Sequence, residues 1–132
     1  FRYKKGRPEI VNFEVGKQKM DHICSAASEL RLQLREGIYT WTLGPSYETP
    51  AEIQDIISLG GNAVGMSTVP EIMKALELGL DITGIACLTN YGSGIKPKIL
   101  SHIDVLEASN RISNKLSDLV NRIIAMNIGH KV

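Results

Sequence analysis

The sequence predicts an α/β protein with a mostly parallel central sheet. Segments with helical apolar spacing alternate with short β-branched or aromatic runs, in the order helix, strand, helix, strand, helix, strand, helix. Two of the predicted strands lead directly into sequences typical of helix starts. This alternation is typical of a parallel sheet with helices packed on it.

The first elements follow from spacing and composition. Residues 1–15 are rich in Lys and Arg, with Gly6 and Pro8, and show little periodicity, so they are predicted to be an extended connector. Residues 17–34 carry apolar side chains at three- and four-residue intervals, which predicts a helix that Gly37 ends. Residues 38–43 are β-branched and aromatic and are predicted to form a strand.

The next two helices are each predicted to open with a capping box. The sequence TPAE at 49–52 places Thr at the N-cap, Pro at the first helical position and Glu where it reaches back to the N-cap amide. The sequence TVPE at 68–71 repeats the pattern. Gly60 is predicted to end the first of these helices and Gly79 the second. A short strand is predicted between them, at residues 62–66.

The last part of the chain predicts one more strand and a long helix. Residues 82–88 are apolar and flanked by Gly, which is typical of a buried parallel strand. A Gly-containing loop follows at 89–100. The sequence SHID at 101–104 predicts a third box-like cap, and the apolar face that follows predicts a helix to about residue 126, with a frayed tail at 127–132.

Composition excludes several classes of protein. The net charge of +1 arises from well-mixed charges with no basic stripe, so no nucleic acid partner is predicted. Because the apolar runs are too short to cross a bilayer, no membrane partner is predicted either. Cys24 and Cys87 show no CxxC spacing and are predicted to be buried free thiols in a reducing cytoplasm. No cluster with metal-ligand spacing is present in the sequence.

The length of 132 residues predicts a single domain over residues 1–132. The chain begins with Phe1 rather than Met, and its first residues read as a loop inside a larger protein. A three-stranded sheet would also leave exposed edges. We therefore expect this domain to be the C-terminal portion of a longer polypeptide.

Polar and aromatic residues gather where the first two predicted strands end, at the edge where open α/β sheets bind small molecules. Glu48 precedes the N-cap, so its carboxylate is either a solvated acid near a helix N-terminus or an acceptor for a ligand's N–H groups. Tyr47 is either a core aromatic or a flat wall for a sugar or base. Ser67 is either an N-cap or an anion ligand, and Met66 beside it is typical of packing.

Two further residues open the last loop and the last helix. Asn90 follows the third predicted strand, where its amide either stabilises a turn or reads the edge of a heterocycle. His102 stands at the start of a helix, where a cation is disfavoured. It is therefore expected to be neutral and either partly exposed or bonded to a hydroxyl.

Two segments of the sequence resemble those of a known enzyme family. Residues 44–52 (GPSYETPAE) and 63–71 (AVGMSTVPE) resemble, in order and spacing, the two signature segments of the trimeric purine nucleoside phosphorylases. LTN at 88–90 and SHIDV at 101–105 are similar to the family's next two landmarks. The resemblance implies a three-layer αβα fold with a mostly parallel central sheet and the C-terminal helix packed on it.

The resemblance implies an activity as well. It is phosphorolysis of purine nucleosides to free base and ribose 1-phosphate, in purine salvage, with inorganic phosphate as co-substrate and neither cofactor nor metal. It implies a cytoplasmic homotrimer and a missing N-terminal half that carries most of the phosphate site, since Ser67 alone cannot supply it. The isolated 132-residue chain is expected to be inactive. The amide at Asn90, where relatives that prefer 6-aminopurines have Asp, implies inosine and guanosine as substrates.

Carried over residue by residue, the resemblance assigns three groups of contacts. The purine base would meet Glu48, Asn90, Val64, Gly65 and Tyr47; the ribose would meet Tyr47, Met66 and His102; and phosphate would meet Ser67. Asn90, Glu48 and His102 would be the catalytic residues. Negative charge develops on the departing purine, so a donor at its N7 acts more strongly in the transition state than in the ground state.

Two alternatives remain beside this hypothesis. A sister phosphorylase for 5′-methylthioadenosine has the same architecture, and Asn90 speaks against it. A non-catalytic half-domain that binds purines or serves in oligomerisation would need no phosphate machinery.

Overall fold

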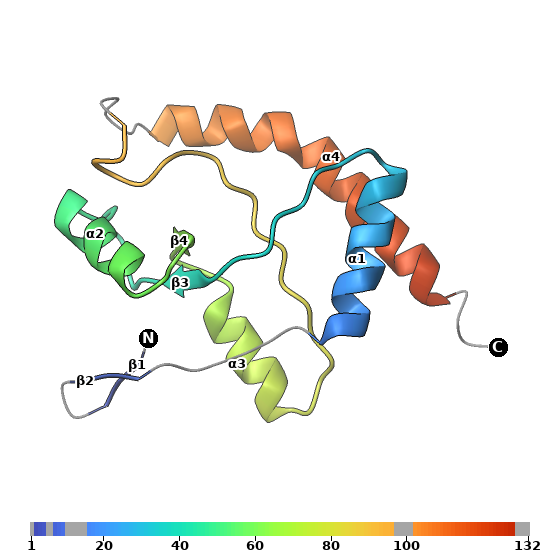
Figure 1. Cartoon of the computed structure of the whole chain (residues 1–132), viewed down its shortest axis with the longest axis horizontal. Helices are drawn as coiled ribbons and strands as arrows, with labels where there is room; N and C mark the ends of the chain where they lie inside the picture. Colours follow the sequence, from blue (N-terminus) through green and yellow to red (C-terminus); the bar gives the residue numbers. More distant parts are fainter. Residues whose placement is uncertain (1, 5–6, 10–15, 97–101, 129–132) are drawn as a thin grey trace. The chain divides into compact units, whose positions relative to one another are not determined.

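The computed structural model describes residues 2–4, 7–9, 16–96 and 102–128. Its helices are α1 (Lys17–Glu29), α2 (Pro50–Ser58), α3 (Val69–Glu77) and α4 (His102–Ile128), and its strands are β1 (Arg2–Lys4), β2 (Arg7–Glu9), β3 (Tyr39–Trp41) and β4 (Ala63–Gly65) (Figure 1). The chain forms two compact units, one made of residues 1–14 and 37–100 and the other of residues 15–36 and 101–132. The single domain over residues 1–132 stays a prediction.

The first unit contains a parallel β–α–β arrangement. β3 and β4 pair in parallel, with Tyr39 opposite Ala63 and Trp41 opposite Gly65, and α2 lies between them in the sequence. One more hydrogen bond, from the Thr42 N–H to the Gly65 carbonyl at 3.0 Å, extends the pairing past the carboxyl end of β3. The strands lie within the predicted ranges 38–43 and 62–66, and the α/β class is confirmed.

The first predicted capping box forms around Thr49. Its hydroxyl accepts from the Glu52 N–H at 3.3 Å, and the Glu52 carboxylate accepts from the Thr49 N–H at 2.7 Å. The Thr49 N–H and the Thr49 hydroxyl, the latter at 2.8 Å, both donate to the Glu52 carboxylate and lower its pKa, the backbone bond having the larger effect. α2 therefore starts where the sequence predicts it, two residues after Glu48.

The second predicted capping box does not form. Thr68 has φ 77 and ψ −50 and makes no side-chain cap. The N–H of Val69 instead donates to the Ser67 carbonyl at 2.9 Å. This closes a γ-turn of the rare type whose central residue has positive φ. A β-branched residue is strained at positive φ. With Thr68 in the γ-turn and without a side-chain cap, the prediction of a box at 68–71 was wrong, although the helix itself is present.

Helix ends follow the predicted glycines in two cases out of three. Gly60 and Gly79 take φ 89 and 67 just past α2 and α3, as predicted. α1 ends earlier than the predicted 17–34, because Arg31 adopts φ 54 and its N–H bonds to the Ser28 carbonyl at 3.0 Å. Gly37 therefore does not end this helix; a non-glycine residue takes the left-handed position that usually falls to Gly.

Two further predictions about strands were wrong. The apolar run at 82–88 forms no strand; it is extended chain, and Leu88 is 64% exposed. An apolar composition does not make a strand without a neighbour to pair with. At the start of the chain, where a connector was predicted, β1 and β2 pair antiparallel, with Arg2 opposite Glu9. The predicted third cap at 101–104 depends on a residue outside those that the structure describes.

The second unit consists of α1 packed against α4. Ile23, Ala26 and Ala27 of α1 and Ala108 and Leu119 of α4 are buried. An ion pair between Arg122 Nε and Glu29 Oε2, 2.6 Å apart, joins the two helices. α4 extends two residues beyond the predicted end near 126.

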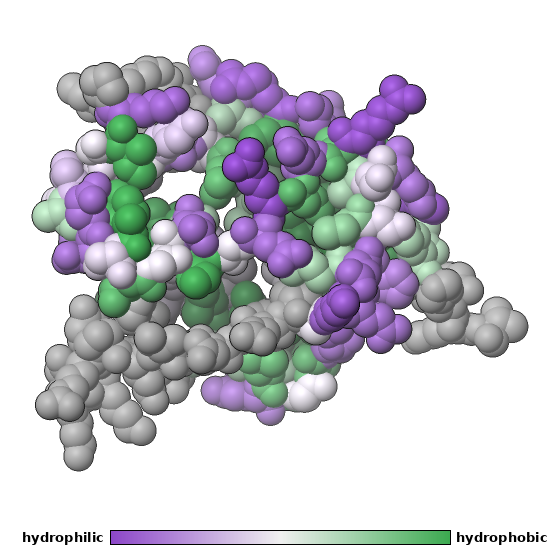
Figure 2. All heavy atoms as spheres, viewed as in Figure 1, coloured by the Kyte–Doolittle hydropathy of each residue, from purple (hydrophilic) through white to green (hydrophobic). Residues whose placement is uncertain are grey.

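Apolar side chains remain on the surface of both units. In the first unit Ile53 is buried, whereas Ile38, Leu43 and Leu59 are more than half exposed. Figure 2 shows hydrophobic residues interspersed with polar ones on one face. Cys24 and Cys87 are free but exposed, so the prediction of buried thiols was wrong: Cys24 points away from the buried α1 stripe and Cys87 lies in the unpaired segment. No described helix is both long and apolar enough to cross a membrane.

Candidate functional site

Glu48 lies in the short loop between β3 and α2 and is half-buried. Its Oε1 accepts a hydrogen bond of 2.5 Å from the hydroxyl of Thr42. The capping box uses the carboxylate of Glu52, so the Glu48 carboxylate makes no capping hydrogen bond at the helix start. Of the two interpretations of Glu48, an oriented acceptor agrees with this geometry better than a freely solvated acid.

The Met66 side chain joins the loop after β3 to the turn after β4 by packing against Gly44. Gly44 approaches Met66 so closely that a Cβ on Gly44 would stand 2.5 Å from the Met66 sulfur. Gly44 also has φ 64, a conformation that favours glycine. The structure therefore brings together the two segments that the sequence singled out, with Glu48 on one and Met66 on the other.

Ser67 is exposed at the start of the turn that precedes α3. Its hydroxyl lies 3.3 Å from that of Thr68, and its carbonyl accepts from Tyr39 Oη, also at 3.3 Å. The first amides of α3 offer little to an anion, because the Val69 N–H is used in the γ-turn and Pro70 has no N–H. The Ser67 hydroxyl is thus the exposed side-chain donor next to this helix start.

Asn90 belongs to the same unit and opens the Gly-containing loop. Its Oδ1 accepts from the Thr89 hydroxyl at 2.6 Å, and its Nδ2 donates to the Tyr91 carbonyl at 3.0 Å. A primary amide carries two N–H donors, so one hydrogen of Nδ2 remains for a ligand. Two of the predicted roles, turn stabilisation and recognition of a heterocycle, are therefore compatible in this residue.

The loop after Asn90 passes along the start of α2. A Cβ on Gly92 would lie 2.9 Å from Ile53, and one on Gly94 would lie 2.8 Å from Pro50. Lys96 lies over the Tyr91 ring, 3.8 Å from its centroid, and steadies the loop. These contacts place the Asn90 loop beside α2, which begins two residues after Glu48.

The remaining predicted residues divide between the two units. Val64 and Gly65 are half-buried in β4, and Tyr47 is 46% exposed beside Glu48. His102 is the first residue of α4 and belongs to the second unit. The first unit therefore holds Glu48, Asn90, Val64, Gly65, Tyr47, Met66 and Ser67.

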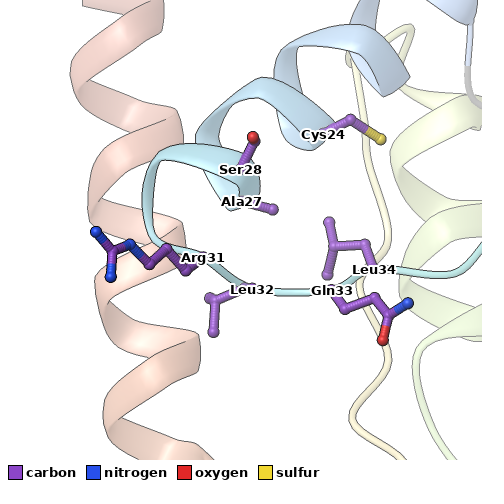
Figure 3. A pocket seen from close by; sticks show the side chains of 7 residues that line it. All are labelled: Cys24, Ala27, Ser28, Arg31, Leu32, Gln33 and Leu34. Atoms are coloured by element: carbon purple, nitrogen blue, oxygen red, sulfur yellow. The ribbon is translucent and has the colours of Figure 1, made fainter.

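Two hollows in the described part of the chain are lined by other residues. One of about 400 Å³ lies at the end of α1, among Cys24, Ala27, Ser28, Arg31, Leu32, Gln33 and Leu34 (Figure 3). Another of about 230 Å³ is lined by Trp41, Pro70, Met73, Lys74 and Glu77. Neither gathers titratable groups suited to chemistry at a sugar. In the described part of the chain, no group of three or more His, Cys, Asp or Glu is placed to hold a metal ion.

Sequence reasoning missed three supporting residues. Thr42 holds Glu48, Thr89 holds Asn90, and Tyr39 holds the carbonyl of Ser67. A Thr directly before a candidate Asn is a local signal that could have pointed to Thr89. Thr42 and Tyr39 are separated from their partners by 6 and 28 residues. The fold of the loop after β3 reveals Thr42, and the pairing of β3 with β4 reveals Tyr39.

The chain is similar in sequence to known purine nucleoside phosphorylases. Purine nucleoside phosphorylase 1 of Geobacillus stearothermophilus is 42% identical over 98 residues, which are 74% of this chain and 36% of the relative. A probable 6-oxopurine nucleoside phosphorylase of Moorella thermoacetica is 47% identical over 88 residues, 67% of this chain and 34% of the relative. The chain thus spans about a third of the length of the curated relatives it matches.

A solved structure is similar in fold. The Schistosoma purine nucleoside phosphorylase in complex with hypoxanthine matches with a TM-score of 0.77 and 26% identity, over 83% of this chain and 41% of that one. The sequence profile of the phosphorylase superfamily matches residues 1–125. With the parallel β3–β4 pair, the oriented Glu48 and the profile match over nearly its whole length, the chain belongs to the phosphorylase superfamily.

Proposed function

We propose that the protein containing this chain is a purine nucleoside phosphorylase. It transfers the ribose of a 6-oxopurine nucleoside to inorganic phosphate and releases the free base and ribose 1-phosphate. The observation that carries the proposal is the oriented carboxylate of Glu48, in a chain that is 42% identical over 98 residues to a relative named for this activity. The Moorella relative's name, which specifies 6-oxopurines, supports the substrate class.

Glu48 and Asn90 would act on opposite edges of the base. The Glu48 carboxylate would accept from the purine N1–H and, where present, from the 2-amino group, and the remaining N–H of the Asn90 amide would hydrogen-bond N7 and the 6-oxo group. As the glycosidic bond breaks, the electron pair of that bond moves onto the base. A donor at N7 stabilises this charge as it develops, and loss of a donor of this kind costs about 10²–10³-fold in rate. Thr89 fixes the Asn90 amide by donating to Oδ1, so the orientation requires no rearrangement during the reaction.

The ribose and the phosphate would lie next to the turn after β4. Met66 would pack against the sugar, with Tyr47 on its other side, and His102 would hold the 5′-hydroxyl. Ser67 would donate its hydroxyl to phosphate. Because the first residues of α3 offer few free N–H donors, the rest of the phosphate site would come from the remaining polypeptide.

Assembly and location belong to the same proposal. The chain spans about a third of its curated relatives, so a further N-terminal portion would complete the catalytic domain. The complete protein would be a cytoplasmic homotrimer in purine salvage, with phosphate as its co-substrate and without a cofactor. The apolar side chains exposed in both units, Leu43 and Leu88 among them, agree with further packing partners.

Phosphate-dependent release of base from inosine, guanosine and adenosine tests the proposal. The wild-type protein is expected to cleave inosine and guanosine in preference to adenosine. Glu48→Ala should lower kcat/KM for inosine about 10²-fold or more, while Asp55→Ala, which removes an exposed acid of α2, should leave it unchanged. A preference for adenosine would reassign Asn90, and no phosphorolysis of any of the three would refute the proposed activity.

A further inference from the structure

A groove lies between α3 and the Trp41 side chain of β3, and none of the proposed substrate contacts involves it. It has a volume of about 230 Å³ and is lined by Trp41, Pro70, Met73, Lys74 and Glu77. The four residues of α3 follow the spacing i, i+3, i+4 and i+7, so they form one face of the helix. We call this hollow the α3 groove.

Trp41, which lines the groove, has a hydrogen-bond donor without an acceptor. Its Nε1 is buried, and none of the described residues accepts a hydrogen bond from it. A buried indole N–H usually has an acceptor, because one without an acceptor has lost its bonds to water and gained none in return. A segment that covers the α3 groove is therefore expected to supply an oxygen acceptor.

The helix beside the groove also lacks a full cover. Its apolar stripe consists of Val69, Ile72, Met73 and Leu76 and borders the groove at Met73. No residue of α3 is buried, and Leu76 is 42% exposed, whereas α2 of the same unit buries Ile53. An amphipathic helix of a globular protein turns its apolar stripe toward a core. Part of the core that α3 needs thus lies outside the described residues.

The charges at the groove offset each other. Lys74 Nζ and Glu77 Oε2 are 3.2 Å apart, and both side chains are more than half exposed. Because the two charges are opposite and adjacent, the groove has no net attraction for an anion or a cation. An uncharged segment, with an apolar side chain and a carbonyl oxygen, fits this groove better than a charged ligand does.

We propose that an uncharged segment of the same polypeptide, outside residues 1–132, packs into the α3 groove and accepts a hydrogen bond from Trp41 Nε1. The chain corresponds to 36% of the Geobacillus relative, so the rest of the polypeptide is long enough to cover this face. The inference goes beyond the proposed substrate contacts and rests only on the further portion of the polypeptide that the proposed function includes.

Photo-crosslinking of the complete protein tests the proposal. One variant carries p-benzoylphenylalanine in place of Glu77 on the groove, and the control carries it in place of Asp55, an exposed acid of α2. Mass spectrometry after irradiation and digestion identifies the peptide that is joined to the probe. Position 77 should be joined to a peptide of the same polypeptide outside residues 1–132, and position 55 should not be joined to that peptide.

Two results of this experiment would overturn the proposal. One is a crosslink from position 77 only to peptides within residues 1–132. The other is a crosslinked product that migrates as a dimer under denaturing conditions, because such a product places a second copy on the groove.

Hydrogen exchange of the Trp41 indole N–H is a second, independent measurement. Its NMR resonance in the complete protein is assigned by its disappearance in Trp41→Phe. A covered and hydrogen-bonded N–H should persist after transfer into D₂O, whereas exchange within the dead time would contradict the proposal. If Trp41→Phe does not fold, judged by circular dichroism, the crosslinking result decides.

Phosphorolysis of inosine by the same protein separates this inference from the proposed function. A crosslink from position 77 to a peptide outside residues 1–132, in a protein without phosphorolysis, would uphold the inference and refute the activity. Phosphorolysis by a protein whose crosslinks stay within residues 1–132 would do the reverse.

Discussion

The hydroxyl of Tyr39 in β3 lies directly over Gly65 in β4. A Cβ on Gly65 would stand 2.2 Å from Tyr39 Oη and 3.1 Å from Cζ, and the same hydroxyl donates to the Ser67 carbonyl at 3.3 Å. Because Gly65 has no side chain, Tyr39 can reach across β4 to the turn that presents Ser67. The strand pair thus supports the candidate phosphate ligand through one aromatic side chain.

Gly65→Ala should therefore destabilise the first unit. The added methyl group forces Tyr39 off its position, and overpacking of this kind costs about 1–3 kcal/mol. Urea unfolding of Gly65→Ala, Tyr39→Phe and the double variant measures the coupling between the two positions. In the Tyr39→Phe background the methyl group should cost clearly less, since the hydroxyl it meets is gone. Equal costs in both backgrounds would show that Tyr39 is not the obstacle.

The conformation of Thr68 should lower the stability of the first unit while it orients Ser67. With φ 77 in a β-branched residue, its backbone stores strain of about 1–3 kcal/mol. Thr68→Gly is expected to raise the free energy of unfolding by about 1 kcal/mol and, given the proposed function, to raise KM for phosphate because the turn loosens. Urea unfolding and phosphate kinetics of the complete protein measure both effects.

Arg31→Gly provides the matched control for Thr68→Gly. Arg31 is also left-handed, with φ 54, but it closes α1 in the other unit. This variant should stabilise by about 1 kcal/mol and leave KM for phosphate unchanged. If Thr68→Gly behaves in the same way as Arg31→Gly, the strain near Ser67 has no part in phosphate binding.

The helix caps and helix ends that depend on residues close in the sequence could be predicted from the sequence. The Thr49–Glu52 box, Gly60 and Gly79 were predicted correctly because capping and left-handed turns are decided within a few residues. The box predicted at Thr68 did not form because Thr68 takes φ 77 in a γ-turn, and the carbonyl of Ser67 in that turn accepts from Tyr39, 28 residues away.

The remaining differences also have long-range causes. The segment 82–88 has the composition of a buried strand, but a strand forms only against a partner, and composition does not report one. Glu48 and Asn90 could be singled out from the sequence because each follows a predicted strand. Thr42 could not, since its role appears only when the loop folds back on the end of β3.

Asn90→Asp should change the substrate class. A carboxylate at this position has no donor for N7 of a 6-oxopurine in its ionised form, and it would also meet the Thr89 hydroxyl. We expect kcat/KM for inosine to fall about 10²–10³-fold, with adenosine affected less. Steady-state phosphorolysis of the two nucleosides gives the ratio. An unchanged preference would mean that the amide of Asn90 only supports the turn through Tyr91.

The ion pair between Glu29 and Arg122 should make the second unit sensitive to acid. The Arg122 side chain donates to the Glu29 carboxylate and lowers its pKa below the ordinary value of 4.5. A carboxyl group whose pKa is lowered by folding stabilises the folded state above its unfolded pKa, and this contribution is lost as pH falls through the folded value. Wild-type stability should therefore decline below about pH 4.5, and Glu29→Gln should show a shallower decline.

Urea unfolding at a series of pH values from 7 down to about 3 measures this difference. Glu52 has a lowered pKa too, through its bonds to Thr49, so Glu52→Gln is the matched comparison in the first unit. Each variant should make the free energy of unfolding fall less steeply as the pH is lowered. The double variant should reduce this fall further, because the two sites lie in separate units and share no partner. If Glu29→Gln follows the wild-type pH profile, the 2.6 Å contact with Arg122 contributes nothing to acid stability, as is common for exposed ion pairs.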